Sequence, residues 1–81
     1  MTFGERLKRL REVAGWSQNE LAKRSGVPRP TISDLEAGKQ RGLTVANARK
    51  LARALGVSLD LLIGPEEDED VEAPVAVLGG V

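Results

Sequence analysis

The chain has 81 residues, 41% of them hydrophobic and 30% charged, which allows one domain with a small core. Cysteine, histidine and tyrosine are absent. Their absence excludes a disulfide framework, a thiolate metal site and catalysis by a thiol or an imidazole. We therefore expect a protein that is not an enzyme and that has no metal site and no cofactor.

The formal net charge of zero is the sum of two unlike parts. Residues 1–64 hold all 12 Lys and Arg against six acidic residues, whereas residues 65–81 hold the other six acidic residues and no base. A basic region followed by an acidic tail favours a polyanionic partner, although a mixed surface with a solvated tail has the same composition. No apolar run approaches the ~18 residues that a membrane-spanning helix needs, and the start of the chain lacks a signal-peptide core, so a soluble intracellular protein is expected.

The first predicted helix runs from Phe3 to about Ala14. Thr2 and Glu5 form a capping-box pair, and Gly15 ends the helix as a left-handed cap. Its apolar residues recur at helical spacing: Phe3, Leu7, Leu10 and Ala14. The second helix repeats the arrangement, with Ser17 as cap, Glu20 reaching back to it, and Ser25-Gly26 as the stop.

The third predicted helix follows Val27 and ends at Gly38, with Ile32 and Leu35 facing inward. Two prolines, Pro28 and Pro30, stand at its start. Because a proline disfavours the helical conformation of the residue before it, the helix is expected to begin at Pro30 rather than at Arg29.

Two further helices complete the folded part. Thr44 caps the fourth, which Gly56 closes, and Ser58 opens a short fifth helix that ends before Gly64-Pro65. Short turns between five helices predict an all-α domain of residues 1–64. Residues 65–81 form an acidic and then apolar tail, which we expect to be disordered because its acids repel one another.

Residues 17–38 have the layout of a helix-turn-helix, in which one helix braces a second against the DNA major groove. The sequence resembles the phage-repressor and Cro family, also known as xenobiotic-response-element type regulators. The resemblance is carried by LKRLR at 7–11, WSQNELA at 16–22, SGV at 25–27, TISDLEAGK at 31–39 and LARALGV at 51–57. It implies a compact five-helix lambda-repressor-like DNA-binding domain, a double-stranded DNA ligand and a two-fold homodimer.

The resemblance assigns DNA contacts to the start of the second helix and to the third. Gln18 corresponds to a phosphate contact, although an ordinary first-turn polar residue would fit as well. The outward positions of the third helix are Arg29, Pro30, Thr31, Ser33 and Asp34. Arg29 reads guanine or touches phosphate, with equal weight, and Asp34 accepts from cytosine N4 or is a plain surface acid.

Other residues are assigned to phosphate contacts or to structure. Lys39 and Arg41 would neutralise phosphates from the following loop, unless that loop is merely solvated. The family commonly pairs a basic residue late in the first helix with a Glu near the end of the third, here Arg11 and Glu36. Trp16 is interpreted as a core residue rather than a ligand platform.

The predicted function is sequence-specific transcriptional regulation, as a repressor that binds a near-palindromic operator as a homodimer. Leu59, Leu62 and Ile63 are expected at the subunit contact because the fifth helix is short, apolar and terminal. The expected location is the cytoplasm, at the nucleoid. The alternative is an antitoxin or interaction module whose tail grips a protein partner. Two other roles for the tail are open. It only solubilises the protein, or its acids mimic phosphate and shield the basic face of the domain.

Overall fold

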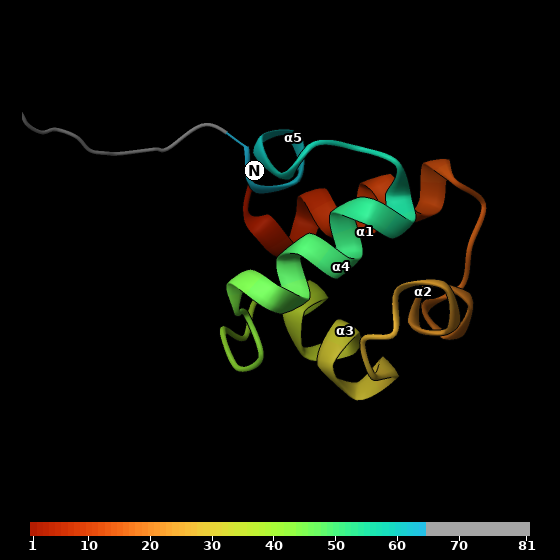
Figure 1. The fold of residues 1–81 in the computed structure, drawn as a ribbon. Coiled ribbons are helices and arrows are strands. Elements are labelled where there is room, and N and C mark those ends of the chain that lie inside the picture. Colours follow the sequence, from red (N-terminus) through yellow and green to blue (C-terminus); the bar gives the residue numbers. More distant parts are fainter. Residues whose placement is uncertain (65–81) are drawn as a thin grey trace, which may run out of the picture.

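The computed structural model describes residues 1–64, which contain five helices and no strand. The helices are α1 (Phe3–Val13), α2 (Gln18–Ser25), α3 (Arg29–Glu36), α4 (Val45–Leu55) and α5 (Leu59–Ile63) (Figure 1). The predicted all-α, five-helix fold is therefore confirmed. The predictions for the tail fall on residues 65–81, outside the described part of the chain.

Hydroxyl caps begin four of the five helices, as the sequence predicts. The side chains of Thr2, Ser17, Thr44 and Ser58 each accept a hydrogen bond from the backbone N–H three residues later, at 3.0–3.1 Å. Each cap of this kind stabilises a helix by about 1 kcal/mol. The capping box of α1 is complete, because Glu5 Oε1 accepts from the Thr2 N–H at 2.9 Å.

The capping box predicted for α2 is only half formed. Ser17 caps the helix, but the Glu20 carboxylate does not reach back to it. Instead, Glu20 Oε2 accepts from Arg24 Nε at 2.6 Å, one turn further along the helix. The (i, i+4) ion pair with Arg24 and the capping box require the same carboxylate, and in this helix the carboxylate binds Arg24.

Helix α3 begins one residue earlier than predicted. Arg29 is its first residue and Pro28 occupies the cap position with extended backbone angles and no side-chain cap. The Pro28 carbonyl accepts from the N–H groups of both Thr31 and Ile32, at 3.0 and 3.1 Å. The second proline is tolerated because the first N–H groups of a helix have no partner within the helix.

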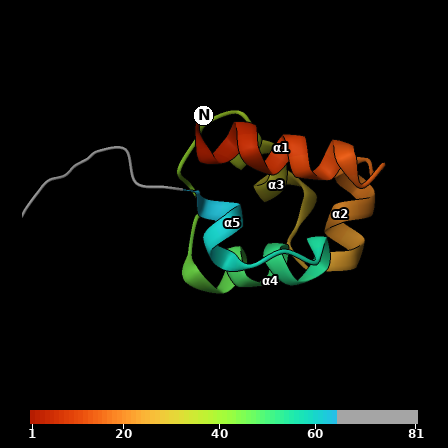
Figure 2. The same cartoon turned by 90° about the horizontal axis from the view of Figure 1, so that it is seen from above.

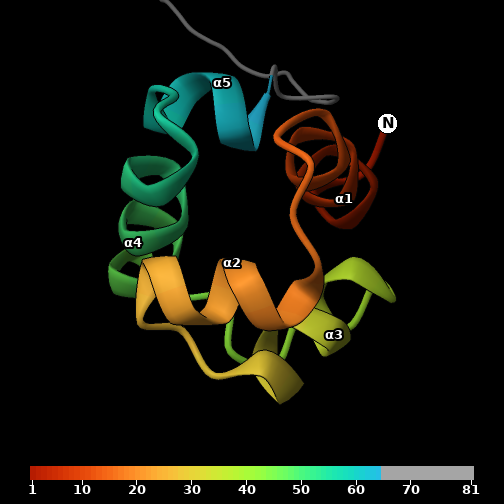
Figure 3. The same cartoon turned by 90° about the vertical axis from the view of Figure 1, so that its right-hand side faces the viewer.

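The core lies between the helices. α1 packs against α3 and α5, α2 packs against α3 and α4, and α4 packs against α5. Figures 2 and 3 show α1, α2, α4 and α5 around this common interior, with α3 closing one side. Its buried hydrophobic residues are Leu7, Leu21, Val27, Ile32, Leu35, Ala48, Leu51, Ala52 and Leu62. None of the helices in residues 1–64 is both long and apolar enough to cross a bilayer.

Gly4 sets the approach of α1 to α3. It is buried, and a Cβ at this position would overlap the carbonyl oxygen of Leu35 and crowd that of Glu36. The first turn of α1 therefore rests directly on the backbone at the carboxyl end of α3. Only glycine allows two backbones to approach this closely.

Candidate nucleic-acid interface

Helix α3 lies at one edge of the molecule and is anchored by two side chains (Figure 1). Ile32 and Leu35 are 0% and 2% exposed, and the side chain of Glu36 at the end of the helix is also buried. Arg29 and Pro30 are exposed, whereas Thr31, Ser33 and Asp34 are half-buried. The structure therefore brings the five predicted reading residues onto one accessible helix. Their contacts with bases remain a prediction.

An ion pair holds the carboxyl end of α3 to α1. Arg11 donates from Nε to Glu36 Oε2 at 2.7 Å and from a terminal guanidinium nitrogen to Glu36 Oε1 at 3.0 Å. The two side chains are only 11% and 5% exposed. This is the pair that the family resemblance implies. The hydrogen bond to Glu36 raises the pKa of Arg11 above its ordinary value, against the opposing effect of desolvation.

The same ion pair binds two more segments of the chain, one through the guanidinium group and one through the carboxylate. The other terminal nitrogen of Arg11 donates to the Trp16 carbonyl at 2.8 Å, and Gln18 Nε2 donates to Glu36 Oε1 at 3.0 Å. One ion pair thereby fixes the turn before α2, the first residue of α2 and the end of α3. A bidentate, largely desolvated pair has a single geometry, so it orients α3 rigidly on the domain.

This network changes the interpretation of Gln18. Its amide group has two N–H donors, and one of them is used by Glu36. A phosphate at this position would be bound by the remaining amide N–H and by the backbone N–H groups in the first turn of α2. The predicted phosphate contact of Gln18 stays a prediction, now with a defined set of donors.

Trp16 packs against the core, as expected, and has a second contact. Its ring is half-buried, and the Arg24 guanidinium lies 4.5 Å from the ring centroid. Such a stack covers the outer face of the ring. It leaves Trp16 as part of the brace between α1 and α2.

The loop between α3 and α4 contacts α3 through Thr31 and α4 through Asn47. Gly42 has a positive φ of 84° and its Cα lies so close to Thr31 Cγ2 that a Cβ would overlap this methyl group. Asn47 Nδ2 donates to the Gly42 carbonyl at 2.7 Å. These contacts carry the exposed Arg41, the neighbour of Gly42, to the side of the third helix. Sequence reasoning missed Asn47, because nothing in its spacing indicates the carbonyl that it binds.

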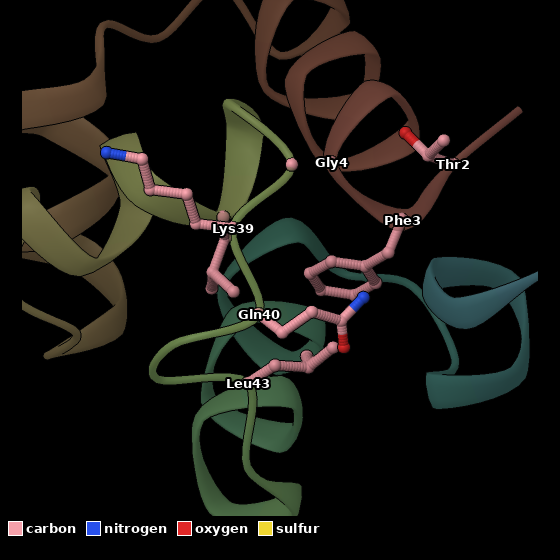
Figure 4. Close-up of a pocket in the computed structure, with 8 residues that line it drawn as sticks. Thr2, Phe3, Gly4, Lys39, Gln40 and Leu43 are labelled. Carbon is pink, nitrogen blue, oxygen red and sulfur yellow. The ribbon is translucent and has the colours of Figure 1, made fainter.

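Lys39, the other predicted phosphate contact, is exposed and weakly held. Its Nζ lies 3.9 Å from Asp34 Oδ1, and the two side chains are 63% and 32% exposed. Lys39 is one of the residues that line a small pocket of about 110 Å³, and Figure 4 shows its side chain extending away from Phe3, Gln40 and Leu43. A pocket of this size has room for only a few water molecules.

One predicted residue of the subunit contact lies elsewhere. Leu62 is fully buried in the core, so its side chain is not available to a second subunit. It points inward because α5 packs against α1 and α4, and Leu62 belongs to the core cluster between the helices. Leu59 is half-buried, and Ile63 is 42% exposed.

Among residues 1–64, no group of three or more acidic or metal-binding side chains is arranged to hold a metal ion. The predicted contact residues on this face carry guanidinium, ammonium, amide and hydroxyl groups, and one carboxylate, that of Asp34. These are the groups that bind phosphates and base edges.

Comparisons with known proteins agree with this geometry. A family model described as Helix-turn-helix matches residues 7–62. A Neisseria meningitidis protein named a hypothetical transcription factor is 38% identical over 68 residues, 83% of this chain and 61% of that protein. The HTH-type transcriptional repressor RghR of Bacillus subtilis is 38% identical over 77 residues, 90% of this chain and 57% of the repressor. The chain thus spans less than two thirds of either relative.

A solved structure resembles the described fold. The restriction-modification controller protein C.AhdI from Aeromonas hydrophila superposes with a TM-score of 0.71 at 41% sequence identity, over 75% of this chain and 91% of that one. These similar proteins are named as regulators or controllers of transcription and restriction-modification, not as enzymes.

Proposed function

Because the chain belongs to the phage-repressor and Cro family of helix-turn-helix proteins, we propose that it binds double-stranded DNA as a transcriptional repressor. The observation that carries the proposal is that α3 is held firmly on the domain by one of its faces and by its carboxyl end. Two buried residues, Ile32 and Leu35, attach the helix to the core, and the Arg11–Glu36–Gln18 network fixes its carboxyl end. A helix held rigidly by one face presents the other face to a partner without an entropic cost of ordering.

In this proposal the exposed face of α3 enters the major groove. Arg29 donates to guanine or to phosphate, and Thr31 and Ser33 hydrogen-bond to base edges or phosphates. Asp34 accepts from cytosine N4 on a base pair that follows along the groove. The backbone of Pro30 makes the first turn stiff, because its ring fixes φ.

Phosphates on either side of the groove set the register. Gln18 and the first-turn N–H groups of α2 bind one phosphate. Lys39 and Arg41 neutralise phosphates from the loop after α3. These contacts supply affinity and salt dependence, whereas α3 supplies sequence preference.

We further propose that the protein acts as a homodimer through α5. Leu59 and Ile63 are four residues apart and therefore share one side of the helix. Ile63 is 42% exposed and offers apolar surface on that side. A two-fold dimer would read two half-sites about one helical turn, ~34 Å, apart on a near-palindromic operator.

The test is selection of bound duplexes from a random pool with the full chain at about 0.15 M salt. Enrichment of a near-palindromic motif, together with a dimer mass by light scattering on the selected DNA, is the expected result. A motif without two-fold symmetry, bound by a monomer, would remove the dimer from the proposal. A folded protein that enriches no sequence would remove DNA reading itself and favour a protein partner instead.

A further inference from the structure

A second hollow lies between α1 and α5, away from the proposed DNA interface. It has a volume of about 240 Å³ and is lined by Met1, Arg6, Arg9, Leu10 and Leu61. Neither α2, α3 nor the loop between α3 and α4 contributes a lining residue. In Figure 1, α5 is at the upper edge of the molecule and α3 at the lower edge. We call this hollow the α1–α5 groove.

The groove combines apolar surface with positive charge. Met1 and Leu61 are 57% and 52% exposed, although both are large apolar side chains. Arg6 and Arg9 add two guanidinium groups, and no acidic residue lines the groove. Two acids are next in sequence to lining residues. Glu5 is committed to the Thr2 N–H of the capping box, and Asp60 precedes Leu61 in the first turn of α5 without lining the groove. The surface therefore fits an occupant with carboxylates next to small apolar side chains.

The described chain ends at the rim of this groove. Gly64 packs so closely on Arg6 that a Cβ at Gly64 would overlap the guanidinium group. The Arg6 Nε is buried and has no hydrogen-bond partner among residues 1–64. Gly64, the last described residue, therefore lies beside an arginine whose Nε–H donates to no acceptor within residues 1–64.

The sequence after Gly64 has the chemistry that the groove requires. Glu66–Glu72 contains six acids and no base, and Ala73–Val81 is uncharged, with three valines and a leucine. Glu66 is only two residues from Gly64, and eight extended residues span up to ~27 Å, more than the distance to Arg9 one turn further along α1. Both parts of the segment can therefore reach the groove.

We propose that residues 66–78 of this chain dock in the α1–α5 groove of the same molecule. The acids pair with Arg6 and Arg9, and Val75, Val77 and Leu78 cover Met1, Leu10 and Leu61. A segment tethered at the rim has an effective concentration in the millimolar range, so weak contacts suffice to hold it. The inference does not depend on DNA binding.

The docked segment and the proposed subunit contact use different sides of α5. Leu61 is two residues from both Leu59 and Ile63, a rotation of about 200° around the helix. Residues 66–78 would thus leave the face of Leu59 and Ile63 uncovered. They would also leave α3 open, which separates this arrangement from a tail that mimics phosphate on the DNA-reading face.

The experiment is paramagnetic relaxation enhancement on the full chain. Because the protein has no cysteine, Gly79→Cys gives a single attachment point for a nitroxide. We expect the amide signals of Arg9, Leu10 and Leu61 to lose at least about half their intensity at low salt, and to recover as salt screens the ion pairs. A mixture of tagged unlabelled protein with untagged ¹⁵N protein should show no loss, because the docking is within one molecule.

Two variants test the contacts. Neutralising the segment (Glu66→Gln, Glu67→Gln and Asp68→Asn together) should restore most of the lost intensity without touching the core. Arg6→Gln with Arg9→Gln should do the same, whereas the matched pair Arg49→Gln with Arg53→Gln, exposed on α4, should leave the attenuation unchanged. The untagged spectrum of each variant shows that the domain is folded.

Three results would overturn the proposal. Attenuation centred on α3 and Gln18 would place the segment on the DNA-reading face. Attenuation that appears equally in the mixed sample would show docking on a second copy. Uniform intensities throughout residues 1–64 would show that the segment does not dock. None of these results would bear on the selection experiment that tests DNA binding.

Discussion

The two ends of α3 are built in opposite ways. The carboxyl end is locked, because Gly4 brings α1 onto the backbone at Leu35 and Glu36, and Arg11 and Gln18 both bind the Glu36 carboxylate. The amino end carries no side-chain cap and presents Arg29 and Pro30 to solvent. One end therefore fixes where the helix lies, and the other is free to contact a partner. The difference predicts that substitutions at the carboxyl end affect folding, whereas those at the amino end affect recognition.

The largest expected effect comes from Glu36→Ala. Its removal leaves Arg11, 11% exposed, without its carboxylate, and breaking such a pair from one side costs roughly 3 kcal/mol in the free energy of unfolding. Urea denaturation measures the loss. Glu20→Ala, which breaks an exposed (i, i+4) pair, is the control and should cost less than about 1 kcal/mol. Equal losses at the two positions would contradict a locked carboxyl end.

The next effect is at Gly4. A methyl group at this position would overlap the Leu35 carbonyl oxygen, so Gly4→Ala should move α1 away from α3. We expect a loss of about 1–3 kcal/mol in the free energy of unfolding. Alanine is intrinsically the better helix former by about 1 kcal/mol, so an increase in stability would show that the two helices do not meet here. Lys8→Ala, exposed on the same helix, should change stability by less than about 0.5 kcal/mol.

At the amino end, Arg29→Ala should leave stability almost unchanged, because the side chain is exposed. If Arg29 reads guanine, selection of bound duplexes should show a weaker preference at one base position, by roughly 1–3 kcal/mol. Arg41→Ala is the comparison, and it should weaken binding to all sequences while lowering the salt slope by about one unit. A uniform loss for Arg29→Ala as well would make Arg29 a phosphate contact.

The smallest effect is expected at Asn47, which holds the loop that carries Arg41. Asn47→Ala removes the hydrogen bond to the Gly42 carbonyl, but alanine favours the helix, so the net change in stability should stay within about 1 kcal/mol. DNA affinity should nevertheless fall by part of the Arg41→Ala effect. In the double variant the two losses should not add, because both act through one phosphate contact. Additive losses would show that Asn47 acts independently of Arg41.

The sequence predicts local structure well where the cause is local. The caps at Thr2, Ser17, Thr44 and Ser58 bind N–H groups only three residues away, so their pattern is legible in the chain. The prediction was wrong where two local interactions compete. The Glu20 carboxylate binds Arg24 instead of the backbone N–H at the cap of α2. Helix α3 begins at Arg29, one residue before the predicted start at Pro30.

Contacts between distant segments were predicted only where the family resemblance supplied them. The pair of Arg11 and Glu36 spans 25 residues and came from that resemblance. Its extension to Gln18, the strap from Asn47 to Gly42 and the contact of Gly4 with the end of α3 were not anticipated. Leu62 was assigned to the subunit contact because a short apolar helix does not reveal which side faces inward.

The amino-acid sequence by itself determined the five helices and the hydroxyl caps of four of them, because spacing and capping act over a few residues. Only the tertiary structure decided how close α1 lies to α3, which carboxylate binds Gln18, and which leucine of α5 is buried. Each of these outcomes has several alternatives that the sequence allows equally, and packing of the helices against one another selects one of them. The choice is made by close packing and by the cost of leaving a buried charge or polar atom without a partner.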